Sequence, residues 1–325
     1  MKSITIIIIF LFSINIALAD KPAYKLFDID GDEQDYEDML EEAAEANIVF
    51  FGELHNNPIC HWLQLELTKA LHDEVGERLV LGAEMFESDN QLIIDEYLSG
   101  KIPQSNFEKE VRLWNNYRTD YKPLLEFAND NDLVFIATNI PRRYAAFVAR
   151  NGLESLNEFS NEAKKFFPPL PIEVDLNLKC YSAMDDMMSG MHSAAQKDGK
   201  KSSMKEINDK MKELTPDERE EKMKKMMDAM KKAQYFKEAQ AVKDATMAHF
   251  ILQNMNDDNV FIHYNGTYHS DNHESIVWFI KRDATQFDVI TIASVLQSDI
   301  DELDEKNLGL ADYIIVIPEN MTTTY

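Results

Sequence analysis

The chain has 325 residues, of which 45% are hydrophobic and 10% aromatic, so it can form one large or two modest folded domains and is not a disordered protein. Acidic residues outnumber basic ones by 58 to 33, which leaves a formal net charge of −25. A surface of this charge repels nucleic-acid phosphates and anionic lipid headgroups, so we expect neither a nucleic-acid partner nor attachment to a membrane surface.

The first nineteen residues have the pattern of a secretory signal peptide. Lys2 supplies a positive charge, residues 4–16 are almost wholly apolar, and Ala17-Leu18-Ala19 matches a small-residue cleavage site. The apolar run is too short to span a bilayer comfortably. We therefore expect cleavage after Ala19 and export to the periplasm or the exterior. No cysteine lies near the cleavage point and no second long apolar run follows it, so we expect neither a lipid anchor nor a transmembrane segment in the mature chain.

The mature chain keeps two cysteines, Cys60 and Cys180. In an oxidising compartment two cysteines can form a disulfide, and closing a loop of this length would stabilise the fold by restricting the unfolded chain. The sequence does not show whether the two residues lie close together, so their pairing stays open at this point.

Six short apolar runs predict strands. Most of them are continuous rather than alternating, which is typical of strands that are buried on both faces of a sheet. One helical stretch begins at Asn57-Pro58 after the first run, and another covers residues 90–98 after the second. Strands that alternate with helices indicate right-handed crossovers and a parallel sheet. We therefore expect an α/β fold, a parallel-sheet α/β/α sandwich, with strands at residues 48–51, 79–81, 133–137, 260–264, 289–293 and 313–317.

The pattern changes between residues 153 and 252. This segment contains no convincing strand and is rich in Lys, Glu and Met. Thr215-Pro216-Asp217-Glu218 predicts a helix start, with Thr as N-cap, Pro in the first turn and Glu in the capping-box position. We expect a smaller all-helical insertion domain over residues 153–252, and a sheet domain formed by residues 20–152 and 253–325.

A cluster of methionines in this segment allows two interpretations. Met184, Met187, Met188 and Met191 stand beside His192, and thioether and imidazole groups can ligate a soft metal or haem iron. A stripe of methionines that packs against a neighbouring element is the commoner explanation.

Polar residues that follow three of the predicted strands form a candidate site. Glu53 and His55 follow the first strand, Glu84 the second, and His269 the strand at residues 260–264. The carboxyl ends of parallel strands share one edge of the sheet, where ligands bind. We therefore expect these four side chains to converge, although they lie far apart in the sequence.

The set suits two kinds of chemistry. Two imidazoles and two carboxylates can supply an acid and a base around an activated water, so all four residues are candidate catalytic residues of an enzyme. His55, Glu84 and His269 could also hold a divalent metal with an open position. Candidate residues for binding a substrate or an anionic group are Asn139, Arg142, Arg143 and Gln240.

Several motifs resemble those of the ChaN-type haem-binding proteins, in the same order over about residues 45–280. They are Gly52-Glu53-Leu54-His55, Gly82-Ala83-Glu84-Met85-Phe86, Trp114 with Tyr117, Tyr121 and Pro123, residues 137–143, Ala239-Gln240 with Asp244 and Met247-Ala248, and Gly266-Thr267-Tyr268-His269. The resemblance implies an α/β/α sheet domain with a smaller helical domain. It also implies haem binding at a dimer interface, with iron held by a tyrosine, and a role in iron uptake.

The resemblance leaves three functions open. The first is haem binding for haem or iron acquisition, for which Tyr181 and Tyr235 are the candidate iron ligands. The second is a metal-dependent hydrolase, a peptidase or an esterase, because the wider superfamily also holds the Tiki metalloproteases, the TraB proteins and the erythromycin esterases. The third is a protein that binds a partner through the helical insertion.

Overall fold

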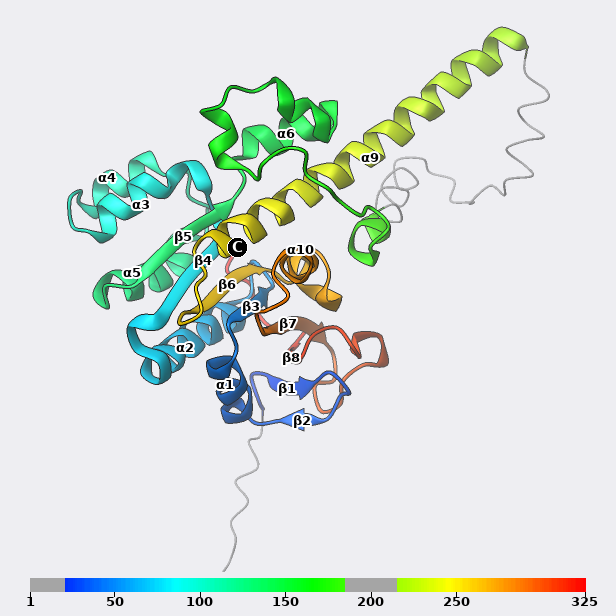
Figure 1. Ribbon diagram of the computed structural model, residues 1–325. Coiled ribbons are helices and arrows are strands. Elements are labelled where there is room, and N and C mark those ends of the chain that lie inside the picture. The colour runs from blue at the N-terminus through cyan, green and yellow to red at the C-terminus, as the bar shows by residue number, and fades with distance from the viewer. Residues whose placement is uncertain (1–20, 185–214) are drawn as a thin grey trace, which may run out of the picture.

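One eight-stranded sheet forms the centre of the computed structural model, which describes residues 21–184 and 215–325 (Figure 1). The strand order is β2-β1-β8-β7-β3-β6-β4-β5. β1 pairs antiparallel with β2 and β8, and the remaining neighbours are parallel. The predicted α/β fold with a parallel sheet is therefore confirmed. The strands are β1 (Lys25–Asp28), β2 (Glu33–Gln34), β3 (Ile48–Glu53), β4 (Leu79–Glu87), β5 (Val134–Asn139), β6 (Val260–Gly266), β7 (Val289–Gln297) and β8 (Tyr313–Pro318).

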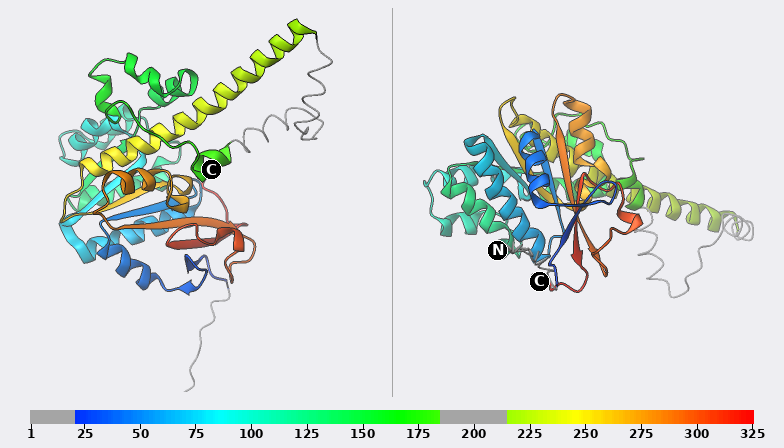
Figure 2. Two further views of the ribbon diagram at one scale, coloured as in Figure 1. Left: turned by 45° about the vertical axis from the view of Figure 1, so that its right-hand side comes forward. Right: turned by 90° about the horizontal axis from the view of Figure 1, so that it is seen from below.

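Helices cover both faces of the sheet, as the two views of Figure 2 show. The alternation along each strand sends Val49 and Phe51 to one face, and Ile48 and Phe50 to the other. The helices are α1 (Tyr36–Glu45), α2 (Pro58–Val75), α3 (Gln91–Leu98), α4 (Gln104–Glu110), α5 (Lys122–Asp130), α6 (Arg142–Asn151), α9 (Pro216–Gln253) and α10 (Ile276–Asp283).

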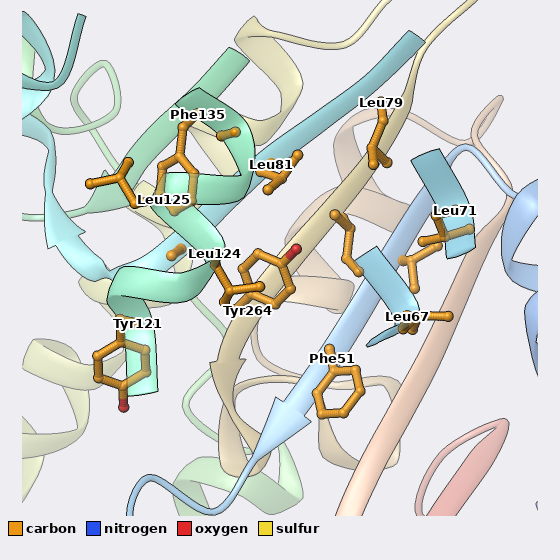
Figure 3. Packing of buried hydrophobic residues seen from close by; sticks show 14 of the residues in the cluster. Phe51, Leu67, Leu71, Leu79, Leu81, Tyr121, Leu124, Leu125, Phe135 and Tyr264 are labelled. Atoms are coloured by element: carbon orange, nitrogen blue, oxygen red, sulfur yellow. The ribbon is translucent and has the colours of Figure 1, made fainter. Parts of the chain in front are cut away.

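The first face packs against α1, α2 and α5. Figure 3 shows this cluster, in which Leu67 and Leu71 of α2 and Leu124 of α5 lie against the strand residues Phe51 and Tyr264. All five side chains are buried. The opposite face packs against α9 and α10, so the sheet is a buried middle layer.

Two helix starts follow from their sequences. The side chain of Asn57 accepts hydrogen bonds from the backbone N–H groups of Ile59 and Cys60, and Pro58 occupies the first turn of α2. Thr215 and Glu218 form the expected capping box at the start of α9. Both predicted starts are confirmed.

The long helix α9 has two different halves. At 38 residues it is about 57 Å long, and in Figure 1 its first half extends beyond the body of the molecule. Met227 in that half is 66% exposed, whereas Ala241 and Val242 in the second half are fully buried. The described part of residues 153–252 holds this helix, short 3-10 segments and a helical segment at residues 179–184, and no strand. The boundaries of a separate helical domain stay a prediction.

Cys60 and Cys180 are both free and buried. Burial raises the pKa of each thiol to about 12, so both remain protonated at neutral pH. Within residues 21–184 and 215–325, no helix combines the length and the apolar character that crossing a membrane requires.

Candidate functional site

The order of the strands in the sheet brings the predicted site residues to one edge. β6 lies between β3 and β4, with Glu53 opposite Gly266 on one side and Ala83 opposite Tyr264 on the other. His55 follows β3 directly, and His269 ends the short 3-10 segment η6 (Thr267–His269) after β6. Two acids and two imidazoles therefore meet around the end of β6.

Glu53 holds His55 in place. His55 Nδ1 lies 2.8 Å from Glu53 Oε1, which also accepts a hydrogen bond from the Tyr121 hydroxyl at 2.7 Å. Gln64 Nε2 donates to the second oxygen, Glu53 Oε2, at 2.5 Å. Burial alone would lower the pKa of His55, but the hydrogen bond to Glu53 and the charge of Glu84 outweigh it and raise this pKa. The fully buried carboxylate of Glu53 thus has three donors and fixes the imidazole ring.

His269 joins two further carboxylates. Its Nδ1 lies 2.5 Å from Asp244 Oδ1, and its Nε2 lies 3.3 Å from Glu84 Oε1. Burial lowers the pKa of His269, but Glu84 and Asp244 more than compensate and raise it to about 10. Burial likewise raises the pKa of Glu84, yet His269 and His55 lower it well below its ordinary value. At neutral pH the cluster therefore holds an imidazolium between two carboxylates.

Gly266 makes the approach of His55 to Glu84 feasible. The backbone N–H of Gly266 donates to Glu84 Oε2 at 2.9 Å. A Cβ atom at this position would lie 2.7 Å from His55 Nε2 and 3.6 Å from Glu84 Oε2, and the first of these distances is too short for non-bonded atoms. A larger residue at this position would therefore displace the His55 ring.

These residues line a pocket of about 740 Å³, which we call the rim pocket. His55, Glu84 and His269 form its polar wall, with Trp114 packed edge-to-face on the His55 ring. A second group of lining residues is apolar. It consists of Ile140, Ala145, Ala146 and Ala149 from the α6 region and Phe236 and Ala239 from α9.

The substrate-binding candidates divide into two groups. Asn139, Arg142 and Gln240 line the rim pocket, whereas Arg143 does not. Arg143 instead pairs with Asp89 and lies 4.4 Å from the centre of the Tyr144 ring. The side chain of Arg142 is 61% exposed and pairs with Glu87.

The candidate haem tyrosines lie outside the rim pocket. Tyr181 is fully buried, and its hydroxyl donates to Asp244 Oδ2 at 2.6 Å. Tyr235 lines a different cavity beside Gly152. Of the methionine cluster, Met184 is buried, and Met187, Met188, Met191 and His192 lie outside the described residues.

A metal centre is not apparent in residues 21–184 and 215–325. No three or more His, Cys, Asp or Glu side chains are arranged there to hold an ion. In the predicted set of His55, Glu84 and His269, both nitrogens of His269 already face carboxylates.

Sequence reasoning missed several members of the site. Gln64 and Tyr121 hold Glu53 from helical segments, and Lys243 lines the pocket with its Nζ donating to Gln240 Oε1 at 3.2 Å. Tyr325 also lines the pocket. The preceding residue, Thr324, holds it there by donating hydrogen bonds to the backbone oxygen of Asn56 and to the Asp120 carboxylate. Asp244 was not missed, because it stands one helical turn from Gln240 and belongs to the motifs that resemble the family.

The family comparison matches residues 39–280 to the family described as "Haem-binding uptake, Tiki superfamily, ChaN". The chain belongs to this family. A solved structure of cofacial haem binding to ChaN of Campylobacter jejuni superposes with a TM-score of 0.60 and 16% identity, over 90% of this chain and 96% of that one. At this identity the likeness supports the fold alone.

Two further similarities are weaker. A chloroplastic RETICULATA-RELATED 5 protein of Arabidopsis thaliana is 28% identical over 142 residues, which is 42% of this chain. The match spans only 19% of the plant protein. A mutant erythromycin esterase has a TM-score of 0.42 at 13% identity, over 83% of this chain and 77% of that one. That score is too low to support an argument about chemistry.

Proposed function

We propose that this protein binds haem in the rim pocket. The observation that carries the proposal is membership of the haem-binding uptake family, because the family match covers the strands and helices that build the pocket. The pocket volume of about 740 Å³ lies within the range of about 300–1,000 Å³ that is usual for small-molecule and cofactor sites.

The chemistry of the pocket walls fits haem. A porphyrin has a flat apolar macrocycle and two anionic propionate groups. The alanine-rich wall of α6 and α9 offers a smooth apolar surface to the macrocycle, and Arg142 and Lys243 are cations that can pair with the propionates. Tyr325 joins Tyr181 and Tyr235 as a candidate iron ligand, because among the described tyrosines it is the one that lines this pocket.

We further propose that the protein is exported and serves haem or iron acquisition, with haem bound between two copies of the chain. The support is the signal-peptide pattern of residues 1–19 and the family membership. When the full chain is expressed with its leader, the N-terminal residue of the accumulated protein should be Asp20. Mass spectrometry of the intact protein checks this, and a chain that still begins at Met1 would contradict export by cleavage.

Ala146→Trp is expected to weaken haemin binding at least tenfold. Ala146 is exposed on α6 and lines the rim pocket, so an indole at this position fills the space without disturbing the core. Titration of the mature protein with haemin, followed through the Soret band, measures the effect. Ala146→Ser is the matched control, because it leaves the pocket volume almost unchanged and should bind haemin like the wild type.

Two outcomes would contradict the proposal. If haemin leaves the Soret spectrum unchanged with folded wild-type protein, the chain does not bind haem. If the Trp and Ser variants bind haemin equally well, haem binds outside the rim pocket.

A further inference from the structure

The exposed half of α9 presents three methionine side chains on one face. Met223, Met227 and Met230 are 54%, 66% and 70% exposed. Their spacing of four and then three residues places them above one another on the helix surface. Their neighbours along the same face are polar, with Glu220 one turn before and Gln234 one turn after. We call Met223, Met227 and Met230 the methionine face.

The residue choice on this face differs from that on the buried half of the same helix. Where α9 packs against the body of the protein, it buries mainly small side chains such as Ala241, Val242 and Ala245, with Met247 beside them. A helix face that only needs to be soluble carries polar residues. Three exposed methionines do not make the helix more soluble. Their thioether sulfurs therefore indicate that this face binds a ligand.

The sequence contains the same spacing a second time. Residues 184–191 and residues 223–230 both have methionines at their first, fourth, fifth and eighth positions. Half of the sixteen methionines of the chain belong to these two segments. Because residues 185–191 lie outside the described part of the structure, only the face on α9 is argued from its geometry.

We infer that the methionine face binds a soft monovalent metal ion, copper(I). Uncharged thioether sulfurs are soft donors that favour copper(I) over zinc(II) and other harder divalent ions. Met227 can share one ion with Met223 or with Met230, because Cβ atoms three or four residues apart are about 5–6 Å from each other and the methionine side chain is flexible. Each sulfur donates a lone pair and the ion releases solvent. The oxidation state stays the same, and no proton moves.

The pH dependence of metal binding distinguishes the methionine face from the histidines of the rim pocket. Histidine and cysteine must lose a proton before they bind a metal, so their affinity falls in acid. Thioethers have no proton to lose. Copper(I) binding by the methionine face should therefore be nearly the same at pH 5 and at pH 7.

The test replaces sulfur and keeps the apolar surface. The full mature protein and its Met223→Leu/Met227→Leu/Met230→Leu variant are titrated with copper(I) in competition with a coloured chelator, at pH 5 and pH 7. Silver(I) serves as a redox-stable probe, and zinc(II) as the hard control. Leucine has nearly the volume of methionine and an equal helix propensity, so circular dichroism should show an unchanged helix content.

We expect the wild type to bind copper(I) and silver(I) but not zinc(II), and the leucine variant to lose at least tenfold in affinity for both monovalent ions. Met255→Leu/Met321→Leu changes two partly buried methionines elsewhere in the fold and should bind like the wild type. Equal binding by the wild type and the triple leucine variant would overturn the inference, as would a wild type that binds no copper(I). A tenfold loss of affinity between pH 7 and pH 5 would assign the ion to histidine instead.

Discussion

Replacing His269 with alanine is expected to lower the free energy of unfolding by about 3–5 kcal/mol, because it leaves two buried carboxylates without their cation. Asp244 is fully buried and Glu84 is 5% exposed, and both contact the imidazole ring. Urea denaturation at pH 7 measures the loss.

Two further variants test whether the loss of stability comes from unpaired charge or from the missing imidazole ring. Adding Glu84→Gln and Asp244→Asn to His269→Ala removes both unpaired charges, so the triple variant should recover part of the lost stability. His273→Asn is the matched control. His273 pairs with Asp312 at 3.1 Å, but its side chain is 22% exposed, and such pairs contribute about 1 kcal/mol or less. If the triple variant is no more stable than His269→Ala, buried charge is not the cause of the loss.

A second histidine is expected to make the fold sensitive to acid. His263 is fully buried in β6, with Nε2 2.8 Å from the Thr138 hydroxyl and Nδ1 3.0 Å from Asn265 Oδ1. Burial lowers its pKa from the ordinary 6.5 to about 4. Between these two values the unfolded chain binds a proton that the folded chain does not, so stability falls as the pH falls from 6.5 to 4. The shift corresponds to about 3 kcal/mol by the end of this range.

The measurement is a comparison of two curves of unfolding free energy against pH. His263→Gln keeps a side chain that can form hydrogen bonds and removes the titrating group. Other groups that titrate between pH 6.5 and pH 4 contribute equally to both proteins, so the difference between the curves isolates His263. We expect the wild type to lose about 3 kcal/mol more than the variant over this range. Parallel curves would contradict the prediction.

The sequence was informative about the sheet because buried parallel strands are continuous apolar runs. Each of the six predicted runs forms a strand, and the structure extends most of them by one to six residues. β1 and β2 were missed. They have four and two residues and pair antiparallel at one end of the sheet, so neither has a long apolar run that would mark it.

The candidate site was predictable only where the chain topology decides it. Glu53 and Glu84 meet because every parallel strand points its carboxyl end to the same edge. Arg143 follows a strand in the same way, yet it turns towards Asp89. The rotamer of an exposed side chain depends on partners that the local sequence does not reveal. Tyr121 shows the opposite case, since an aromatic residue that is typical of core packing also donates its hydroxyl to Glu53.

The position of β6 between β3 and β4 also bears on how the chain folds. β3 and β4 are complete by Glu87, but the strand that joins them starts at Val260. Until that strand arrives, both earlier strands have unpaired backbone groups along an edge, and such edges pair readily with other chains. Sheets that depend on contacts between distant segments also fold slowly. The first third of the chain must therefore avoid aggregation until β6, in the last third, pairs with β3 and β4.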